Sequence, residues 1–355
     1  MFIVNTKVAR KMTKIGINFD GFKIADYQNR PKPVPPKDYI QDSFGIFKEN
    51  GIDMIRVPVY WESYEKDPES FIRELNIISD AADKHNISCI YDNHQWECSS
   101  FLGFGIGFPN SIVSQMFQGR LSKHDSFKPP SREHVEIFWN GWWDRMLKTS
   151  EGMDAWDMQL EYLQKTIETV NKKGSTIGFE LLNEPQVFRH GDFKKISDYH
   201  GYLISKIAGF TDKTILFCYA YAGRITAFNF PWMQAKIKPS SPVSNKIMFD
   251  IHPYPPYYAV MLYFRLISKL MKTSTLFVGE YNSGTGNDAA ISLGQHKRYL
   301  KTLKKFFPYG VIFWQWSYKM DQAHPAFNLT KTVDGKISPN DNFENLVKAM
   351  GEVMV

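Results

Sequence analysis

The chain of 355 residues is poor in cysteine and has no metal-binding motif. Its three cysteines, Cys89, Cys98 and Cys218, form no CxxC pair, and any disulfide scheme leaves one of them unpaired. Two of them lie in apolar, strand-like runs, where cysteine usually behaves as a small hydrophobic side chain. No HExxH motif or close histidine pair occurs. We therefore expect no disulfide framework, no metal and no cofactor.

Long hydrophobic runs are also missing. No apolar stretch is long enough to span a bilayer, and the amino terminus, MFIVNTKVARKMTK, has an apolar start too short for a signal peptide. Taken literally, the sequence predicts a soluble chain that is not exported; a trimmed or non-standard export signal would leave the same pattern.

Concentrated charge is absent too. The 43 basic and 37 acidic residues give a net charge of +6, but the basic residues are scattered along the chain. The densest groups, NKK at 171–173 and KKF at 304–306, are short. This distribution favours a solvated surface and gives little support to a nucleic-acid or membrane partner.

Short apolar runs are abundant, and they alternate with amphipathic segments. Eight runs are nearly continuous in apolar residues, as is typical of parallel strands covered on both faces. They are residues 15–19, 54–59, 87–92, 177–182, 214–219, 247–252, 275–280 and 311–316.

Helical patterns separate these runs. Residues 68–86 carry an apolar stripe at helical spacing, with Asp67 as the expected N-cap and Pro68 at the first helical position. A second stripe runs from residue 156 to 170, and a last helix is expected around residues 343–350.

The alternation predicts an α/β fold, a (β/α)8 (TIM) barrel that spans residues 1–355 as a single domain. The segment RPKPVPP at 30–36 cannot form a helix, and we expect a stiff loop there. Residues 95–154 form a long insertion after the third strand. It is too aromatic to be disordered and too irregular to be a separate domain, so we expect it to fold over the active-site rim.

Polar residues gather at the carboxyl ends of the expected strands, where such barrels build their active sites. Three carboxylic acids, an arginine, two histidines and an amide are among them. Stability alone gives little reason to direct so many groups with a high desolvation cost to one place. The set is Arg56, Asp92, His94, Asn183, Glu184, His252, Tyr254 and Glu280, with Trp314 near the end of the eighth strand.

Glu184 and Glu280 follow the fourth and seventh strands. Two carboxyl groups across a cleft suit glycoside cleavage, because one protonates the leaving oxygen and the other attacks the anomeric carbon; retention of configuration requires them to be about 5 Å apart. Arg56 beside Glu280 would favour the ionised form, whereas Glu184 needs a less charged surrounding to stay protonated. Asn183 is placed to donate to a sugar 2-hydroxyl.

Six strand-end motifs, in order, resemble those of glycoside hydrolase family 5, the cellulase family. They are RVPV at 56–59, YDNH at 91–94, NEP at 183–185, HPY at 252–254, VGEY at 278–281 and FWQW at 313–316. The resemblance covers essentially the whole chain, from GINFDG to the final helix. The long insertion departs from the simplest members and leaves the length of the substrate open.

The resemblance implies that Glu184 is the acid/base and Glu280 the nucleophile. Arg56 and Tyr254 would orient the nucleophile. The residues that would contact the sugar at the cleavage point are His94, Asn183 and His252. Trp314 would be its stacking platform.

The expected function is retaining, endo-acting hydrolysis of β-1,4-glucan by double displacement, with a β-linked oligo- or polysaccharide as the partner and a monomer as the active form. Mannan is the first alternative substrate, and a short oligosaccharide or glycolipid the second; the endo preference follows from the resemblance. A non-catalytic sugar-binding barrel would not need paired glutamates. An aldolase-like barrel would need a Schiff-base lysine or a phosphate-binding glycine loop.

Some residues have plain structural alternatives. Arg56 in a buried strand needs a paired acid whatever the function. A metal site built from His94, His252 and the glutamates is conceivable, but its spacing is unlike known motifs. Glu97 is an extra acid without a derived role. Five tryptophans are equally suited to sugar stacking and to loop anchoring: Trp61, Trp96, Trp139, Trp142 and Trp143.

Overall fold

The computed structural model describes most of the chain: residues 14–29, 33–117, 130–149, 152–222, 237, 247–254, 257–271, 276–282, 291–306, 309–318 and 326–353. The amino-terminal start and residues 30–32 of the proline-rich segment lie outside the described residues, and residues 33–36 are not helical. Among the described residues, no helix combines the length and the hydropathy needed to cross a membrane.

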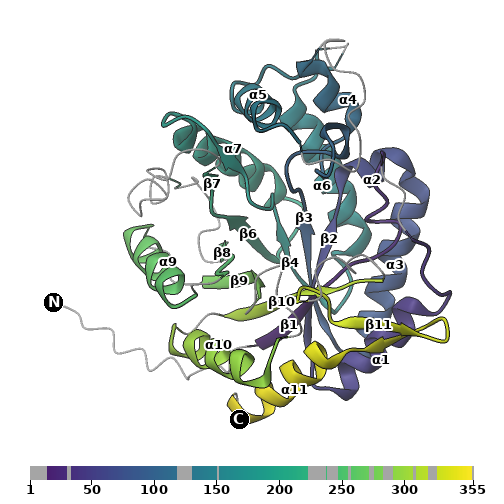
Figure 1. Cartoon of the computed structure of the whole chain (residues 1–355). Coiled ribbons are helices and arrows are strands. Elements are labelled where there is room, and N and C mark those ends of the chain that lie inside the picture. The colour runs from purple at the N-terminus through teal and green to yellow at the C-terminus, as the bar shows by residue number, and fades with distance from the viewer. Residues whose placement is uncertain are drawn as a thin grey trace.

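Eight parallel strands close into a barrel, which confirms the predicted fold (Figure 1). Each strand pairs with the next barrel strand in the sequence, and the last pairs with the first. All eight predicted runs are strands, with ends shifted by at most two residues. They are β1 (Lys14–Phe19), β2 (Met54–Val59), β3 (Ser88–Asn93), β4 (Thr176–Glu180), β6 (Thr214–Cys218), β8 (Ile247–Ile251), β9 (Leu276–Tyr281) and β10 (Gly310–Trp316).

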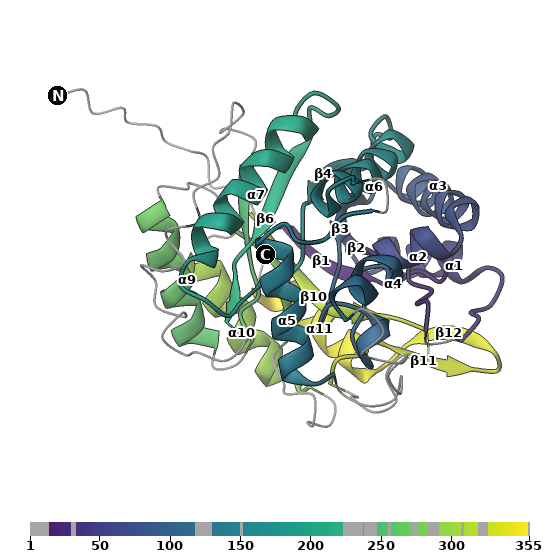
Figure 2. The same ribbon diagram turned by 90° about the horizontal axis from the view of Figure 1, so that it is seen from above.

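Helices surround the barrel on its outer side (Figures 1 and 2). In α3 (Pro68–His85) the N-cap Asp67 carboxylate accepts from the Ser70 backbone N–H at 3.0 Å, and Pro68 is the first residue of the helix, as predicted. The short α2 (Trp61–Lys66) precedes it. The other barrel helices are α1 (Tyr39–Glu49), α6 (Ala155–Val170), α7 (Asp192–Ile207), α9 (Tyr257–Met271), α10 (Leu293–Phe306) and α11 (Asp341–Val353).

The insertion after β3 is folded, and buried aromatic side chains hold it against the barrel helices. Its described elements are η1 (Ser100–Leu102), α4 (Asn110–Val113), η2 (Ser114–Met116) and α5 (Arg132–Trp143), seen from above in Figure 2. Trp142 packs on Phe108 with ring centroids 4.8 Å apart, and Trp143 packs on Tyr199 of α7 at 5.7 Å. Trp139 is equally buried. These three tryptophans therefore anchor the insertion.

Four short strands lie outside the barrel and were not predicted. β11 (Thr330–Val333) and β12 (Lys336–Pro339) form an antiparallel hairpin, while β5 (Gln186–Val187) pairs with β7 (Tyr221–Ala222). Asp334 and Gly335 join the hairpin strands, and both have positive φ, 49° and 75°. An Asp-Gly pair between two short strands is a strong hairpin signal that the sequence does carry.

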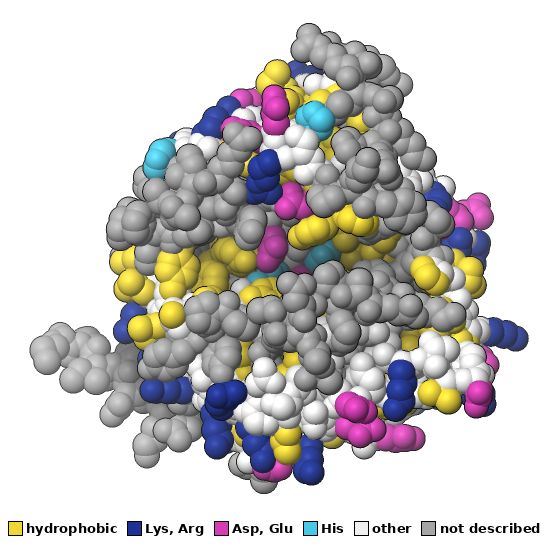
Figure 3. All heavy atoms as spheres, in the orientation of Figure 1, with side chains coloured by type: hydrophobic (Ala, Val, Ile, Leu, Met, Phe, Trp, Pro, Cys, Tyr) yellow, Lys and Arg dark blue, Asp and Glu magenta, His cyan; other side chains and the backbone are white. Residues whose placement is uncertain are grey.

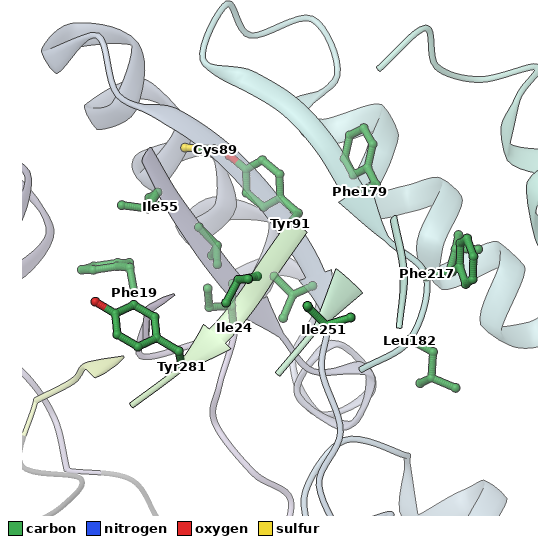
Figure 4. Close-up of a cluster of buried hydrophobic side chains, with 14 of the residues drawn as sticks. Phe19, Ile24, Ile55, Cys89, Tyr91, Phe179, Leu182, Phe217, Ile251 and Tyr281 are labelled. Carbon is green, nitrogen blue, oxygen red and sulfur yellow. The ribbon is translucent and has the colours of Figure 1, made fainter. Parts of the chain in front are cut away.

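Side chains alternate between the outside and the inside of the barrel along each strand. The outward set, which includes Phe19, Ile55, Phe179 and Ile251, packs in the main hydrophobic core (Figure 4). The inward set begins with an apolar cluster of Met54, Ile90, Leu216, Phe277 and Ile312.

Polar side chains replace apolar ones at the next inward positions. Their members come from five strands and contact one another across the barrel, so they fill its interior. We call this set the polar layer; it consists of Asn18, Arg56, Asp92, Glu180 and Asp250. Because barrel interiors are normally filled by branched apolar residues, this layer sets the chain apart from a barrel built for stability alone.

Gly279 on β9 makes room for the polar layer. A Cβ atom there would lie 2.0 Å from Asp250 Oδ2, and the Gly279 N–H donates to Asp250 Oδ1 at 2.5 Å. Gly279→Ala should therefore lower the free energy of unfolding by about 1–3 kcal/mol, because the layer has no space for a methyl group. Denaturant unfolding followed by circular dichroism measures this change.

The matched control for this substitution is Gly351→Ala. Gly351 lies exposed in α11 with nothing within 4 Å of a new Cβ, so alanine should stabilise the helix by about 0.5–1 kcal/mol. Equal unfolding midpoints for Gly279→Ala and the unmutated protein would contradict the tight fit.

Candidate active site

Glu184 and Glu280 meet at the carboxyl-end mouth of the barrel. One oxygen of each carboxylate and one ring nitrogen of His252 all lie within 4.8 Å of one another. Acidic and histidine side chains are visible in the central hollow of Figure 3.

Glu280 on β9 is held at both oxygens. Arg56 Nη1 lies 3.0 Å from Oε1, and the Tyr254 hydroxyl donates to Oε2 at 3.1 Å. His94 Nδ1 lies 3.8 Å from Oε1. These two hydrogen bonds fix the direction of the Glu280 carboxylate.

Arg56 links the polar layer to the mouth. Nε donates to Glu180 at 2.9 Å, and Nη2 lies 3.0 Å from Asp92 Oδ2 and donates to Asn183 Oδ1 at 2.9 Å. The side chain is completely buried. Burial would lower the pKa of Arg56, but the surrounding carboxylates raise it well above its usual value, so the charge is permanent.

Glu184 follows β4 in a backbone conformation that is rare for a residue with a side chain, with φ of 37°. Gln95 Nε2 donates to the carbonyls of Asn183 and Glu184, both at 2.8 Å, and so fixes this turn. Glu184 Oε1 accepts from the Tyr219 hydroxyl at 3.0 Å and lies 2.7 Å from His252 Nδ1.

The surroundings of Glu184 are more charged than the sequence suggested. Burial raises the pKa of Glu184, but the hydrogen bond and charge of His252 and the Tyr219 hydroxyl outweigh it, and the pKa is lowered overall. Burial lowers the pKa of His252, yet Glu280, Cys218 and Asp250 raise it well above its usual value. The Glu184–His252 pair therefore retains one proton that belongs to both groups.

The remaining predicted site residues line the same mouth. His94 Nδ1 lies 2.6 Å from Asp92 Oδ2, and its ring stacks on half-buried Trp314 with centroids 5.3 Å apart and planes 16° apart. Asn183 accepts from Arg56 through Oδ1 and donates from Nδ2 to the Gln95 carbonyl at 2.9 Å. The structure thus brings all eight predicted residues together.

A pocket of about 350 Å³ opens beside Glu184. Trp96, which is 46% exposed, lines it together with Glu97 at the start of the insertion. Arg132 of α5 donates to both Glu97 oxygens at 3.0 and 3.1 Å, which gives that acid a role in holding the insertion. Trp61 is buried and stacks on Tyr162. Of the five tryptophans in question, only Trp96 faces the pocket.

Sequence reasoning missed two residues of the site, Gln95 and Tyr219, and two acids of the polar layer beneath it, Glu180 and Asp250. Tyr219 directly follows β6, at the same kind of strand end that identified the others. Glu180 and Asp250 lie inside apolar runs, where an acid is the signal of a partner across the barrel.

Two triplets bring potential metal ligands close together, Glu184–His252–Glu280 and Glu180–Cys218–His252. Both ring nitrogens of the shared His252 already face acids, Glu184 at 2.7 Å and Asp250 at 3.4 Å. We therefore interpret the triplets as parts of a carboxylate–imidazole network.

Solved structures of the same fold come from several enzymes. The chain superposes on an endogalactoceramidase with a TM-score of 0.69 at 15% identity, covering 96% of this chain and 81% of that one. For endo-glycoceramidase II from Rhodococcus sp. the TM-score is 0.71 at 13% identity, with coverage of 95% and 78%. For the Pseudomonas stutzeri endoglucanase Cel5A it is 0.59 at 14% identity, with coverage of 95% and 93%. These identities show a shared fold only.

Sequence comparison adds the family. No curated protein matches the chain. Residues 12–320 match the family model "Cellulase (glycosyl hydrolase family 5)", which spans nearly the whole barrel. The match covers well over half of the chain, and the chain belongs to glycosyl hydrolase family 5.

Proposed function

We propose that the protein is a retaining β-glycosidase in which Glu280 is the nucleophile and Glu184 the acid/base. The observation that carries the proposal is the approach of their carboxylate oxygens and His252 to within 4.8 Å of one another. Retaining enzymes place the two acids about 5–5.5 Å apart, whereas inverting enzymes leave room for a water molecule.

In the first step, a Glu280 oxygen forms a bond to the anomeric carbon as the glycosidic bond breaks. The proton held by the Glu184–His252 pair passes through Glu184 to the leaving oxygen. In the second step, Glu184 takes a proton from water, whose oxygen attacks the anomeric carbon and releases the Glu280 carboxylate. The pair regains its proton, so the enzyme returns to its starting state.

The other mouth residues position these groups. Arg56 and Tyr254 hold the Glu280 carboxylate and stabilise it when it is released. His252 stores the proton of the acid. We assign sugar contacts to His94, Asn183 and Trp314. Trp314 provides the aromatic face on which the sugar stacks.

We propose β-1,4-glucan, cleaved internally, as the substrate. The cellulase family match supports this choice. Exposed Trp96 at the pocket and half-buried Trp314 behind His94 offer two separate aromatic faces, as binding of more than one sugar ring requires. The single-domain organisation of 1–355, with 95–154 at the rim, remains a prediction.

A glycolipid is the second candidate, and the surface of α9 favours it. Leu262, Leu266 and Leu270 are 55%, 48% and 42% exposed and lie four residues apart, so they share one face of the helix. Val260 of the same helix lines the pocket. Apolar side chains continue from the α9 side of Figure 3 to the central hollow.

The charge of α9 is also consistent with a lipid surface. Its charged residues, Arg265 and Lys269, are both basic and exposed. An amphipathic helix with leucines and basic side chains binds at the interface of an anionic bilayer. This candidate departs from the expectation that the protein meets no membrane.

Substitution of the two glutamates tests the chemistry. Glu280→Gln should reduce hydrolysis by several orders of magnitude while sugar binding and the unfolding midpoint stay near those of the unmutated protein. Glu184→Ala should retain activity on aryl glycosides with a good leaving group, and azide should restore turnover and yield a glycosyl azide. Failure of azide rescue would remove Glu184 from the acid/base role, and large unfolding of Glu280→Gln would make that residue structural.

Trp96 should contact substrate, whereas the buried insertion tryptophans should not. Trp96→Ala should raise the KM for cello-oligosaccharides and reduce the ligand-induced change in tryptophan fluorescence, with unfolding free energy changed by less than about 0.5 kcal/mol. The control Trp142→Ala, in a closely packed aromatic cluster, should cost about 3–5 kcal/mol. An unchanged KM and fluorescence response in Trp96→Ala would exclude Trp96 from the substrate path.

The α9 leucines distinguish the two substrates. Leu262→Gln/Leu266→Gln/Leu270→Gln should reduce hydrolysis of a β-glucosyl lipid in anionic vesicles at least about tenfold, because the apolar contact is lost. It should leave hydrolysis of a soluble aryl β-glucoside unchanged. Ile77→Gln, equally exposed on α3, is the control. Cleavage of cello-oligosaccharides without any cleavage of the lipid by the unmutated protein would reject the glycolipid.

A further inference from the structure

Two buried acids of the polar layer leave one oxygen each without a conventional donor. Arg56 Nε donates to Glu180 Oε2 at 2.9 Å, and the Gly279 N–H donates to Asp250 Oδ1 at 2.5 Å. The other oxygens, Glu180 Oε1 and Asp250 Oδ2, are buried and accept no hydrogen bond from a described donor. Ionised carboxylates only accept, so two of them cannot satisfy each other.

We propose that Glu180 and Asp250 share one buried proton, carried by Glu180 Oε1 and donated to Asp250 Oδ2, and that this proton makes Asp250 a positioning residue for the acid/base pair. In this arrangement a single hydrogen bond gives a partner to both Glu180 Oε1 and Asp250 Oδ2. It also leaves the Arg56 contact unchanged, because the carbonyl oxygen of a neutral carboxyl still accepts.

The charges around Arg56 favour the same state. One guanidinium faces four acids, with Glu180, Asp92, Glu280 and Asp250 at 2.9, 3.0, 3.0 and 3.9 Å. Four full negative charges beside one positive charge in a buried space are unfavourable, and neutralising one acid relieves the repulsion. Burial raises the pKa of Glu180 well above its usual value. Burial also raises the pKa of Asp250, but the neighbouring His252 and Arg56 outweigh it, and the pKa of Asp250 is lowered overall.

An ionised Asp250 acts on the catalytic pair through His252. Asp250 Oδ2 lies 3.4 Å from His252 Nε2, and His252 Nδ1 lies 2.7 Å from Glu184 Oε1. Contacts from Asp250 through His252 to Glu184 thus run from the polar layer to the pocket. Resting on the proposed function, we infer that the negative charge of Asp250 holds the proton that Glu184 delivers.

Other titratable groups also face His252, and they belong to different elements. Glu280 of β9 lies 3.7 Å from Nδ1, and Cys218 Sγ of β6 lies 3.9 Å from Nε2. The Tyr219 ring packs edge-on against the imidazole at 5.6 Å. Burial raises the pKa of the Cys218 thiol and of the Tyr219 phenol, so both stay neutral. Glu280 is present in every variant below, which leaves Asp250 as the charge that the test removes.

Two isosteric substitutions test the proposal. Glutamine reproduces a protonated Glu180, since its carbonyl accepts from Arg56 and its amide donates to Asp250. Glu180→Gln should therefore keep kcat/KM within about threefold and leave its pH profile unchanged. Asp250→Asn removes the charge beside His252 and presents a donor to Nε2. The Glu184–His252 pair should lose its proton at lower pH, and the alkaline limb of kcat/KM should move down by about one pH unit or more.

Infrared difference spectroscopy provides a readout without activity. The unmutated protein at neutral pH should show the carbonyl band of a buried protonated carboxyl, and Glu180→Gln should lack it. This comparison decides the question if Asp250→Asn does not fold, and it remains valid if no glycoside is hydrolysed. Absence of glycosidase activity with the band present would count against the proposed function alone.

Three results would overturn the shared proton. Glu180→Gln could lose activity more than about tenfold, as expected if an ionised Glu180 balances the charge of Arg56. The pH profile of a folded Asp250→Asn could match that of the unmutated protein, which would reduce Asp250 to a structural residue. The infrared spectra of the unmutated protein and Glu180→Gln could be identical in the protonated carboxyl region.

Discussion

The buried guanidinium of Arg56 is the interaction on which the site depends. It contacts side chains of β1, β3, β4, β8 and β9, and one of them is the Glu280 carboxylate at the mouth. Removing either partner of a buried charged contact costs several kcal/mol, because the other charge stays desolvated. The network therefore fixes the positions of these strands relative to one another as firmly as apolar packing would, and it also directs charge toward the mouth.

The barrel separates stability from chemistry by depth. The apolar cluster around Met54 and Phe277 closes the amino-terminal end, the polar layer follows, and the pair Glu184–Glu280 lies at the open end. The insertion adds the wall that carries Trp96, and its buried tryptophans and the Arg132–Glu97 pair hold that wall in place. Variation in such a wall changes substrate choice without disturbing the acids, which fits a family whose fold is shared by endoglucanases and endoglycoceramidases.

The strands and the mouth residues were predictable, because buried parallel strands are continuous apolar runs and their carboxyl ends converge in a barrel. Glu180 and Asp250 of the polar layer were not, since the acids in IGFELL and IMFDIH show only that an apolar run is interrupted. Their meeting depends on strand register across the barrel and on the missing Cβ of Gly279. The charged surroundings of Glu184 were not predicted for the same reason. The sequence suggested that His252 contacts sugar, whereas its contact with Glu184 arises from packing. The Arg132–Glu97 pair joins residues 35 positions apart within the insertion, which spacing alone does not reveal.

In the proposed mechanism, Glu280 attacks the sugar directly because the Glu184 and Glu280 carboxylates leave no room for water. The configuration of the first-formed product tests this most directly. Proton NMR during hydrolysis of an aryl β-cellobioside, or of a β-glucosyl lipid if that is the substrate cleaved, should show the β-anomer first, with the α-anomer growing only by mutarotation. A product released first as the α-anomer would require water between the two acids and would contradict the account.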